Sequence, residues 1–155
     1  ATAPLLFVTP LPIDWMGYAI VILVTAFSCA GIGALIGVVS NNSRITVLWS
    51  QLIYLPSMLL GGLMMPLSVL PESVLNVSFL LPTTYAMQAF SGLAYHQATL
   101  IDPWLAVGIL VVGAILAIAL ALYLFKWDNQ PSSRSKLVAL ALLAWLPYLA
   151  GAFIR

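Results

Sequence analysis

Long apolar runs recur along this chain, and short polar stretches separate them. A helix needs about 20 mostly apolar residues to cross the hydrocarbon core of a bilayer. Four segments reach or approach that length, the last being short and interrupted by Pro147. The pattern therefore predicts an all-α, polytopic membrane helix bundle with spans over about Trp15–Val39, Ile45–Met65, Pro103–Phe125 and Leu137–Ile154.

The stretch Gly61–Phe90 is unlike either a water-exposed loop or a single membrane helix. It carries one formal charge, Glu72, and it contains Pro66, Pro71 and Pro82. Each proline lacks a backbone N–H and clashes with the preceding helical turn. Irregular backbone survives at membrane depth only where protein or a water-filled cavity covers it. The stretch therefore predicts short helices that enter the membrane from one face, as in transporters and channels.

We call residues 66–102, between the second and third predicted spans, the connecting hairpin. Pro71 suits the start of a short helix near Glu72–Leu80, because a missing N–H costs nothing in a first turn. A second short helix is predicted near Thr83–Tyr95, with one of the two threonines after Pro82 as its N-cap. The predicted bundle thus has re-entrant or short helices between its second and third spans.

The basic residues indicate how the spans are oriented. Arg44 lies in the short connection between the first two spans, and three further basic residues lie in Lys126–Lys136, between the last two. The connecting hairpin contains no Lys or Arg. Short loops rich in Lys and Arg remain cytoplasmic. We therefore expect both short connections on the cytoplasmic side and the connecting hairpin on the outer side.

Composition supports the same class of protein. Hydrophobic residues make up 63% of the chain and charged residues 6%, whereas soluble domains carry about 25% charged residues. The net charge of +1 provides no basic patch for nucleic acid. We expect a multi-pass protein of the cell membrane, inner or plasma, surrounded by lipid and without a nucleic-acid partner. Because the chain starts at Ala1 and ends at Arg155 directly after an apolar run, we also expect a piece of a longer protein.

Small residues and a proline within the spans indicate where helices approach or bend. Gly33 and Gly37 form a G-x-x-x-G step. Such a step lets two helix backbones approach closely, either between subunits or within one bundle. Pro56 lies in the middle of the second predicted span, where a proline frees a carbonyl and kinks the helix. That kink is either a hinge that faces a substrate or a static bend.

Catalytic and metal-binding patterns are missing from the sequence. His96 has no Cys, Asp or Glu at ligand spacing, so no metal site is predicted. The chain holds no G-x-x-x-x-G-K-[ST] phosphate loop, no H-E-x-x-H and no G-x-S-x-G. We therefore predict no catalytic residue, no enzymatic activity and no cofactor on this chain.

The order of elements resembles the C-terminal half of an ABC-2 type transporter permease. A span runs into GGLMMPLSVLP, a short outward helix follows, and then come LLPTTYAMQAF and a long span. The resemblance covers about Trp15–Asp128, so residues 1–128 are predicted as this unit and residues 129–155 as a cytoplasmic linker plus an additional apolar helix. It implies that the first three predicted spans correspond to the family's fourth, fifth and sixth. The positions that carry it are Gly61, Gly62, Pro66, Leu67, Ser68, Leu70, Pro71, Leu81, Pro82, Thr84, Tyr85, Ala86 and Ala89.

The resemblance also implies a function and partners. Such a permease exports or flips a substrate and pairs with a second permease copy, identical or different. A separate ATPase subunit, which binds ATP and Mg, drives it. The family's first three spans are missing here, and the final apolar segment is an addition; the alternative is a membrane-anchoring or sensor module of a longer receptor. The outer gate implied by the resemblance comprises Gly61, Gly62, Pro66, Pro71, Pro82, Thr84 and Tyr85.

Overall fold

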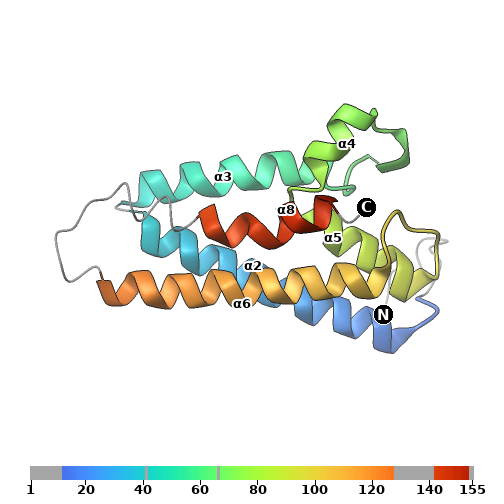
Figure 1. Ribbon diagram of the computed structural model, residues 1–155, viewed down its shortest axis with the longest axis horizontal. Helices are drawn as coiled ribbons and strands as arrows, with labels where there is room; N and C mark the ends of the chain where they lie inside the picture. Colours follow the sequence, from blue (N-terminus) through green and yellow to red (C-terminus); the bar gives the residue numbers. More distant parts are fainter. Residues whose placement is uncertain (1–11, 41, 66, 128–141, 154–155) are drawn as a thin grey trace, which may run out of the picture.

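The computed structural model describes most of the chain, and every regular element within the described residues is a helix. Three long helices run along one another, while shorter helices occupy one end and one flank of the bundle (Figure 1). The prediction of an all-α membrane helix bundle is therefore confirmed. The described residues are 12–40, 42–65, 67–127 and 142–153.

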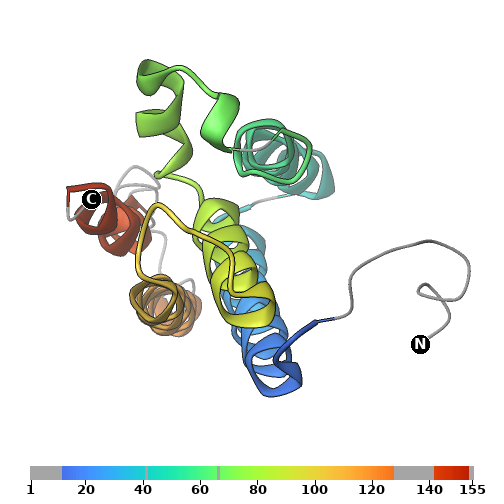
Figure 2. The same cartoon turned by 90° about the vertical axis from the view of Figure 1, so that its right-hand side faces the viewer.

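The long helices α2, α3 and α6 make up the body of the bundle. Seen end-on, α2 lies between α3 and α6, and α8 lies beside α6 (Figure 2). In Figure 1, α8 runs antiparallel to α6. In chain order the helices are α2 (Trp15–Val39), α3 (Ser43–Leu60), the 3₁₀ turn η1 (Leu67–Val69), α4 (Glu72–Ser78), α5 (Pro82–Ala89), the π-helical turn η2 (Phe90–Ala94), α6 (Pro103–Trp127), the 3₁₀ turn η3 (Leu143–Trp145) and α8 (Leu146–Phe153).

Two helices of the described chain are long and apolar enough to cross a membrane. They are α2 and the Pro103–Phe125 part of α6, both at the predicted places. α3 is not one of them, because it is less apolar than α2 and α6. It also ends at Leu60 rather than at the predicted Met65. Of the fourth predicted span, residues 137–141 and 154 lie outside the described residues. The apolar helical stretch Leu143–Ala152 that follows is shorter than a span.

The two ends of α3 have local causes. At its start, the side-chain oxygen of Asn42 accepts a hydrogen bond from the Ile45 N–H at 2.9 Å, which caps the helix. After Leu60, Gly61 takes the C-cap position, and Gly62 follows with a φ of 87°. That left-handed conformation favours glycine. The apolar sequence continues, but these two glycines turn the chain out of the helix toward the connecting hairpin.

The connecting hairpin contains the two short helices that were predicted, with one correction. α4 and α5 lie near the expected residues, and α5 continues into η2. The predicted threonine cap of α5 is wrong, because Leu81 occupies the N-cap position and Pro82 the first turn. Thr83 and Thr84 consequently lie inside the first turn, and their hydroxyls bond to neighbouring segments instead.

Small residues bring α2 and α6 together. At Gly31 a Cβ would lie 3.0 Å from the Ala114 carbonyl oxygen and 3.4 Å from the Ala117 Cβ. Gly33 and Gly37, by contrast, have no described atom within 4 Å of the place where a Cβ would be. Packing of the G-x-x-x-G step within this bundle is therefore not seen in the described chain. A contact between subunits through Gly33 and Gly37 stays a prediction.

We expect Gly31→Leu to destabilise the bundle and Gly33→Leu to leave its stability nearly unchanged. A larger side chain at position 31 meets the backbone of α6, whereas one at position 33 meets open space. Overpacking of this kind costs about 1–3 kcal/mol. Thermal unfolding of the two purified variants in the same detergent measures the difference, and equal losses would contradict this packing.

Candidate functional site

One part of the connecting hairpin, α5 with η2, packs against the long helices, whereas α4 projects from the end of the bundle (Figures 1 and 2). α5 contacts α2, α3 and α6, and in Figure 2 it lies in front of α2 at one end of the bundle. Tyr85 and Ala89 are 0% exposed, and Phe79 is 1% exposed. The Ile13 N–H donates to the Ala94 carbonyl at 2.8 Å, which joins the start of α2 to the same hairpin. Protein therefore covers this apolar connection, as irregular backbone at membrane depth requires.

A single carbonyl joins α3 to the hairpin. The Ser57 carbonyl accepts from the Gly61 N–H at 3.0 Å and from the Thr83 hydroxyl at 3.3 Å. A Cβ at position 61 would overlap both the Thr83 hydroxyl and the Ser57 carbonyl. Glycine at this position therefore lets the first turn of α5 rest directly on the end of α3.

Pro56 lies next to this junction, and α3 continues through it. Because proline has no N–H, the Leu52 carbonyl loses its usual helical donor. The hydroxyl of the adjacent Ser57 is buried and has no hydrogen-bond partner among the described residues. α3 is thus short of hydrogen bonds where the hairpin meets it. Whether Pro56 is a hinge or a static bend stays open.

Most of the predicted gate residues meet at this junction of α3, α4 and α5. The Thr84 hydroxyl donates to the Ser78 carbonyl and closes the corner between α4 and α5, where Pro82 is buried. Pro71 is exposed at the start of α4, and Pro66 lies outside the described residues. The gate residues at the junction are Gly61, Gly62, Pro82, Thr84 and Tyr85.

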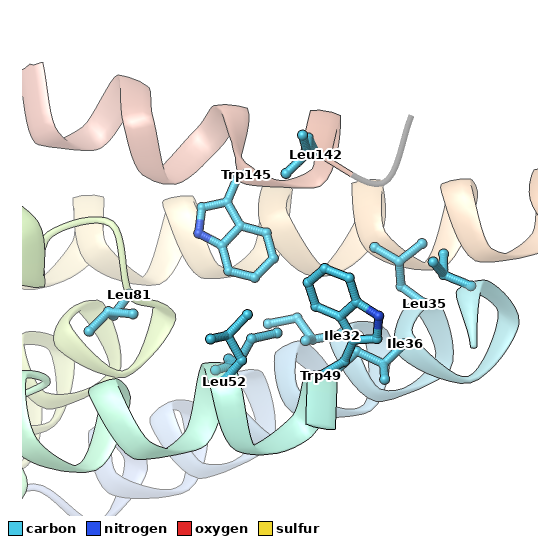
Figure 3. Close-up of a pocket in the computed structure, with 10 residues that line it drawn as sticks. Ile32, Leu35, Ile36, Trp49, Leu52, Leu81, Leu142 and Trp145 are labelled. Atoms are coloured by element: carbon cyan, nitrogen blue, oxygen red, sulfur yellow. The ribbon is translucent and has the colours of Figure 1, made fainter. Parts of the chain in front are cut away.

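A cavity of about 320 Å³ lies beside the junction, between α2 and α3 (Figure 3). Its walls consist of aliphatic and tryptophan side chains only. Leu81 of the hairpin lies at one end, while Trp49 of α3 and Trp145 of η3 project into it from opposite sides. Moving a charged group into such surroundings without a partner is costly. The cavity therefore suits an apolar group and disfavours a charged one.

Tyr85 is fully buried, as is Thr84 among the predicted gate residues. Burial, together with the neighbouring Tyr148, raises the pKa of Tyr85 to about 12. The phenol therefore stays protonated near neutral pH, and it donates to the Tyr148 carbonyl at 2.9 Å. Sequence reasoning missed Tyr148 as a partner. The available signal was a tyrosine within an otherwise aliphatic run, since a buried phenol needs a hydrogen-bond partner.

Charged groups lie away from this site. Glu72, His96 and Asp102 are exposed. Within the described ranges, no three His, Cys, Asp or Glu side chains lie together closely enough to hold a metal ion. The junction and the cavity offer hydrogen bonds and apolar surface, which suit binding and conformational change better than bond-making chemistry.

An all-helical membrane bundle whose inserted hairpin borders an apolar cavity has the architecture of a membrane permease. A comparison with protein families matches residues 1–95 to the ABC-2 type transporter family. The match covers more than half of the chain, so this chain belongs to the ABC-2 type transporter family and is a permease part, not itself catalytic. Comparisons with curated proteins and with solved structures gave no significant match.

The family match ends before the third predicted span. Its last residue is Tyr95, at the end of η2, whereas the resemblance in the sequence extended to Asp128. α6 and the C-terminal segment, which we define as Leu142–Phe153, therefore lie beyond the matched residues. Their roles must be argued from the contacts they make.

We expect Gly61→Ala to lower the free energy of unfolding by about 1–3 kcal/mol, because the new methyl group forces Thr83 away from the end of α3. Gly108→Ala in α6 is a matched control, since no described atom lies within 4 Å of its new Cβ. Unfolding midpoints of both variants in detergent provide the comparison. A fully stable Gly61→Ala protein would show that the hairpin does not rest on α3 as described.

Proposed function

We propose that this chain is part of the permease subunit of an ATP-driven exporter, which moves or flips a substrate outward across the cell membrane. The observation that carries the proposal is the inserted hairpin beside an apolar cavity whose walls include α2 and α3. Leu81 of the hairpin lines that cavity, so movement of the hairpin would change access to it. A membrane anchor or a sensor has no need of such an arrangement.

The two ends of the bundle differ in charge, which supports the proposed direction. The turn between α2 and α3 and the end of α6 lie opposite the hairpin (Figure 1). Arg44 lies at that opposite end, whereas the hairpin carries Glu72 and Asp102 and no Lys or Arg. Basic short loops remain cytoplasmic. The hairpin would then face outward in a multi-pass protein of the plasma or inner membrane, and it would act as the outer gate.

In this mechanism ATP and Mg bind to a separate ATPase subunit. ATP would close two ATPase copies and rock two permease copies between inward-facing and outward-facing states. A ligand shifts such an equilibrium only by binding the two states differently. Gly33 and Gly37, which face open space in the described chain, would supply the close contact between permease copies.

The resting junction is suited to reversible opening. The described bonds from the hairpin to α3 include one neutral hydrogen bond, from Thr83 to Ser57. Such a bond contributes about 1 kcal/mol. Separation of the hairpin from α3 would break that bond and uncover Leu81 at the end of the cavity. Opening at this junction would therefore break that described hydrogen bond together with the contacts that α4 and α5 make with α3.

We expect a cysteine introduced at Ile53, which lines the cavity, to change its side of access with ATP. The background is Cys29→Ala, which removes the one native cysteine. In proteoliposomes that hold the permease with its ATPase, an impermeant maleimide should reach Ile53→Cys from the cytoplasmic side without nucleotide. It should reach the same residue from the outer side once ATP hydrolysis in the presence of vanadate has trapped ADP and vanadate on the ATPase. Access from one unchanging side would refute the exporter.

Pro82→Ala and Tyr85→Ala should let the maleimide label Ile53→Cys from the outer side even without nucleotide, while the permease still copurifies with the ATPase. Both changes disturb the corner that positions α5, and neither residue lies at the end where the ATPase would bind. Tyr54→Ala is the matched control, because this tyrosine is 57% exposed on α3. Parent-like labelling in both gate variants would exclude the hairpin as the gate.

A further inference from the structure

The C-terminal segment, Leu142–Phe153, makes specific contacts with the hairpin although it lies beyond the family match. Within it, Ala144 and Tyr148 are buried at 3% and 1% exposure. α8 contacts α6 along its flank, so the segment is part of the bundle. These contacts fix the position of the segment beside α6.

Two hydrogen bonds connect this segment to the hairpin. The Tyr85 hydroxyl of α5 donates to the Tyr148 carbonyl at 2.9 Å. The Trp145 Nε1–H donates to the Leu80 carbonyl, between α4 and α5, also at 2.9 Å. The rings of Tyr85 and Tyr148 lie 5.7 Å apart between centroids. The bonds run in opposite directions, so each side supplies one donor and one acceptor.

The same segment is fixed to the long helices. The hydroxyls of Tyr148 and Ser28 share a hydrogen bond of 3.2 Å, and both residues are buried. A Cβ at Gly113 in α6 would overlap the Tyr148 ring and hydroxyl, and one at Gly151 would overlap the Tyr85 hydroxyl. Glycines therefore permit close approach on both sides of α8. The segment is held by α2 and α6 while it holds the hairpin.

The bonds of Tyr85 and Tyr148 are buried, and the Trp145 bond is half-buried, which gives them their importance. Ser28 is the fourteenth of the 25 residues of α2, near the middle of a helix long enough to cross a membrane. If the hairpin moved away, the Tyr85 hydroxyl and the Trp145 N–H would lose their partners in apolar surroundings. Leaving such groups unpaired is costly. The segment therefore favours one position of the hairpin over all others.

We propose that the C-terminal segment is a clasp that holds the connecting hairpin in its inserted position, with Trp145 and Tyr148 as positioning residues. Trp145 has a second role, because its ring forms one wall of the cavity while its N–H bonds away from the cavity to Leu80. The clasp depends on the proposed function in one respect: the hairpin that it holds is the proposed outer gate. Its effect on the position of the hairpin is a property of this chain alone.

The test uses Leu81→Cys, a buried hairpin position, in the Cys29→Ala background of the full permease in proteoliposomes. The variants Tyr85→Phe and Trp145→Phe keep an aromatic ring but remove one hydrogen bond each. An impermeant maleimide added outside should label Leu81→Cys about fivefold faster for each lost bond, the factor that a typical neutral hydrogen bond implies. Tyr54→Phe, on the exposed side of α3, is the matched control and should leave the rate unchanged.

A second pair of variants leaves both hairpin bonds chemically intact. Gly113→Ala should displace Tyr148 from α6 and speed the labelling of Leu81→Cys, whereas Gly108→Ala on the same helix should not. A cysteine at Ala114 of α6, buried where this helix packs on Gly31 of α2, reports general loosening. It should stay unlabelled in every variant.

Parent-like labelling of Leu81→Cys in the Phe variants and in Gly113→Ala would overturn the clasp. Simultaneous labelling of Ala114→Cys would also overturn it, because the segment would then stabilise the bundle generally and not position the hairpin. The assay contains neither ATP nor ATPase. A failed clasp therefore shows here, whereas a failed exporter assignment shows in the nucleotide-dependent access of Ile53→Cys.

Discussion

Backbone groups that leave regular helices away from water must find partners inside the protein, and the connecting hairpin depends on this constraint more than any other part of the chain. At its corners, side-chain donors bond to backbone carbonyls: two of the donors are threonines of the hairpin, and the third is Trp145 of the C-terminal segment. These bonds set the hairpin against α3, close its own corner and join it to the C-terminal segment, so one requirement fixes its position on three sides. The donor and acceptor pairs are Thr83 with Ser57, Thr84 with Ser78, and Trp145 with Leu80.

Hydrophobic length predicted the long helices well because it is a local property of the chain. α2 has the predicted bounds, and α6 begins at the predicted Pro103. α3 differs, because its apolar sequence continues to Met65 while the helix stops at Leu60. The helix ends just before Gly61, on which Thr83 of the hairpin packs. A hydropathy pattern cannot predict that contact.

The sequence predicted the hairpin residues of the candidate site but not the residues that they contact. Prolines in an apolar stretch pointed to the hairpin and to residues such as Tyr85, but the partner Tyr148 lies 63 residues further along the chain. The glycines show the same limit. G-x-x-x-G spacing indicates that two backbones can approach, yet in the described chain the close contact with α6 is made by Gly31 and not by Gly33 or Gly37. The spacing of glycines shows that a helix can be approached closely, but the position of the neighbouring helix determines which glycine makes the contact.

Within lipid the hydrophobic effect does not drive helices together, so close packing and hydrogen bonds decide which helices remain associated. The C-terminal segment has both: Gly113 and Gly151 permit close approach, and Tyr148 bonds to Ser28 on α2. These contacts hold the segment against the long helices. Because Tyr148 also accepts the Tyr85 hydroxyl, the long helices and the hairpin share one residue as a partner. A movement of the hairpin would therefore change the surroundings of Tyr148, which bonds to Ser28 near the middle of α2. Tyr148 lies in a part of the chain that the family match does not include.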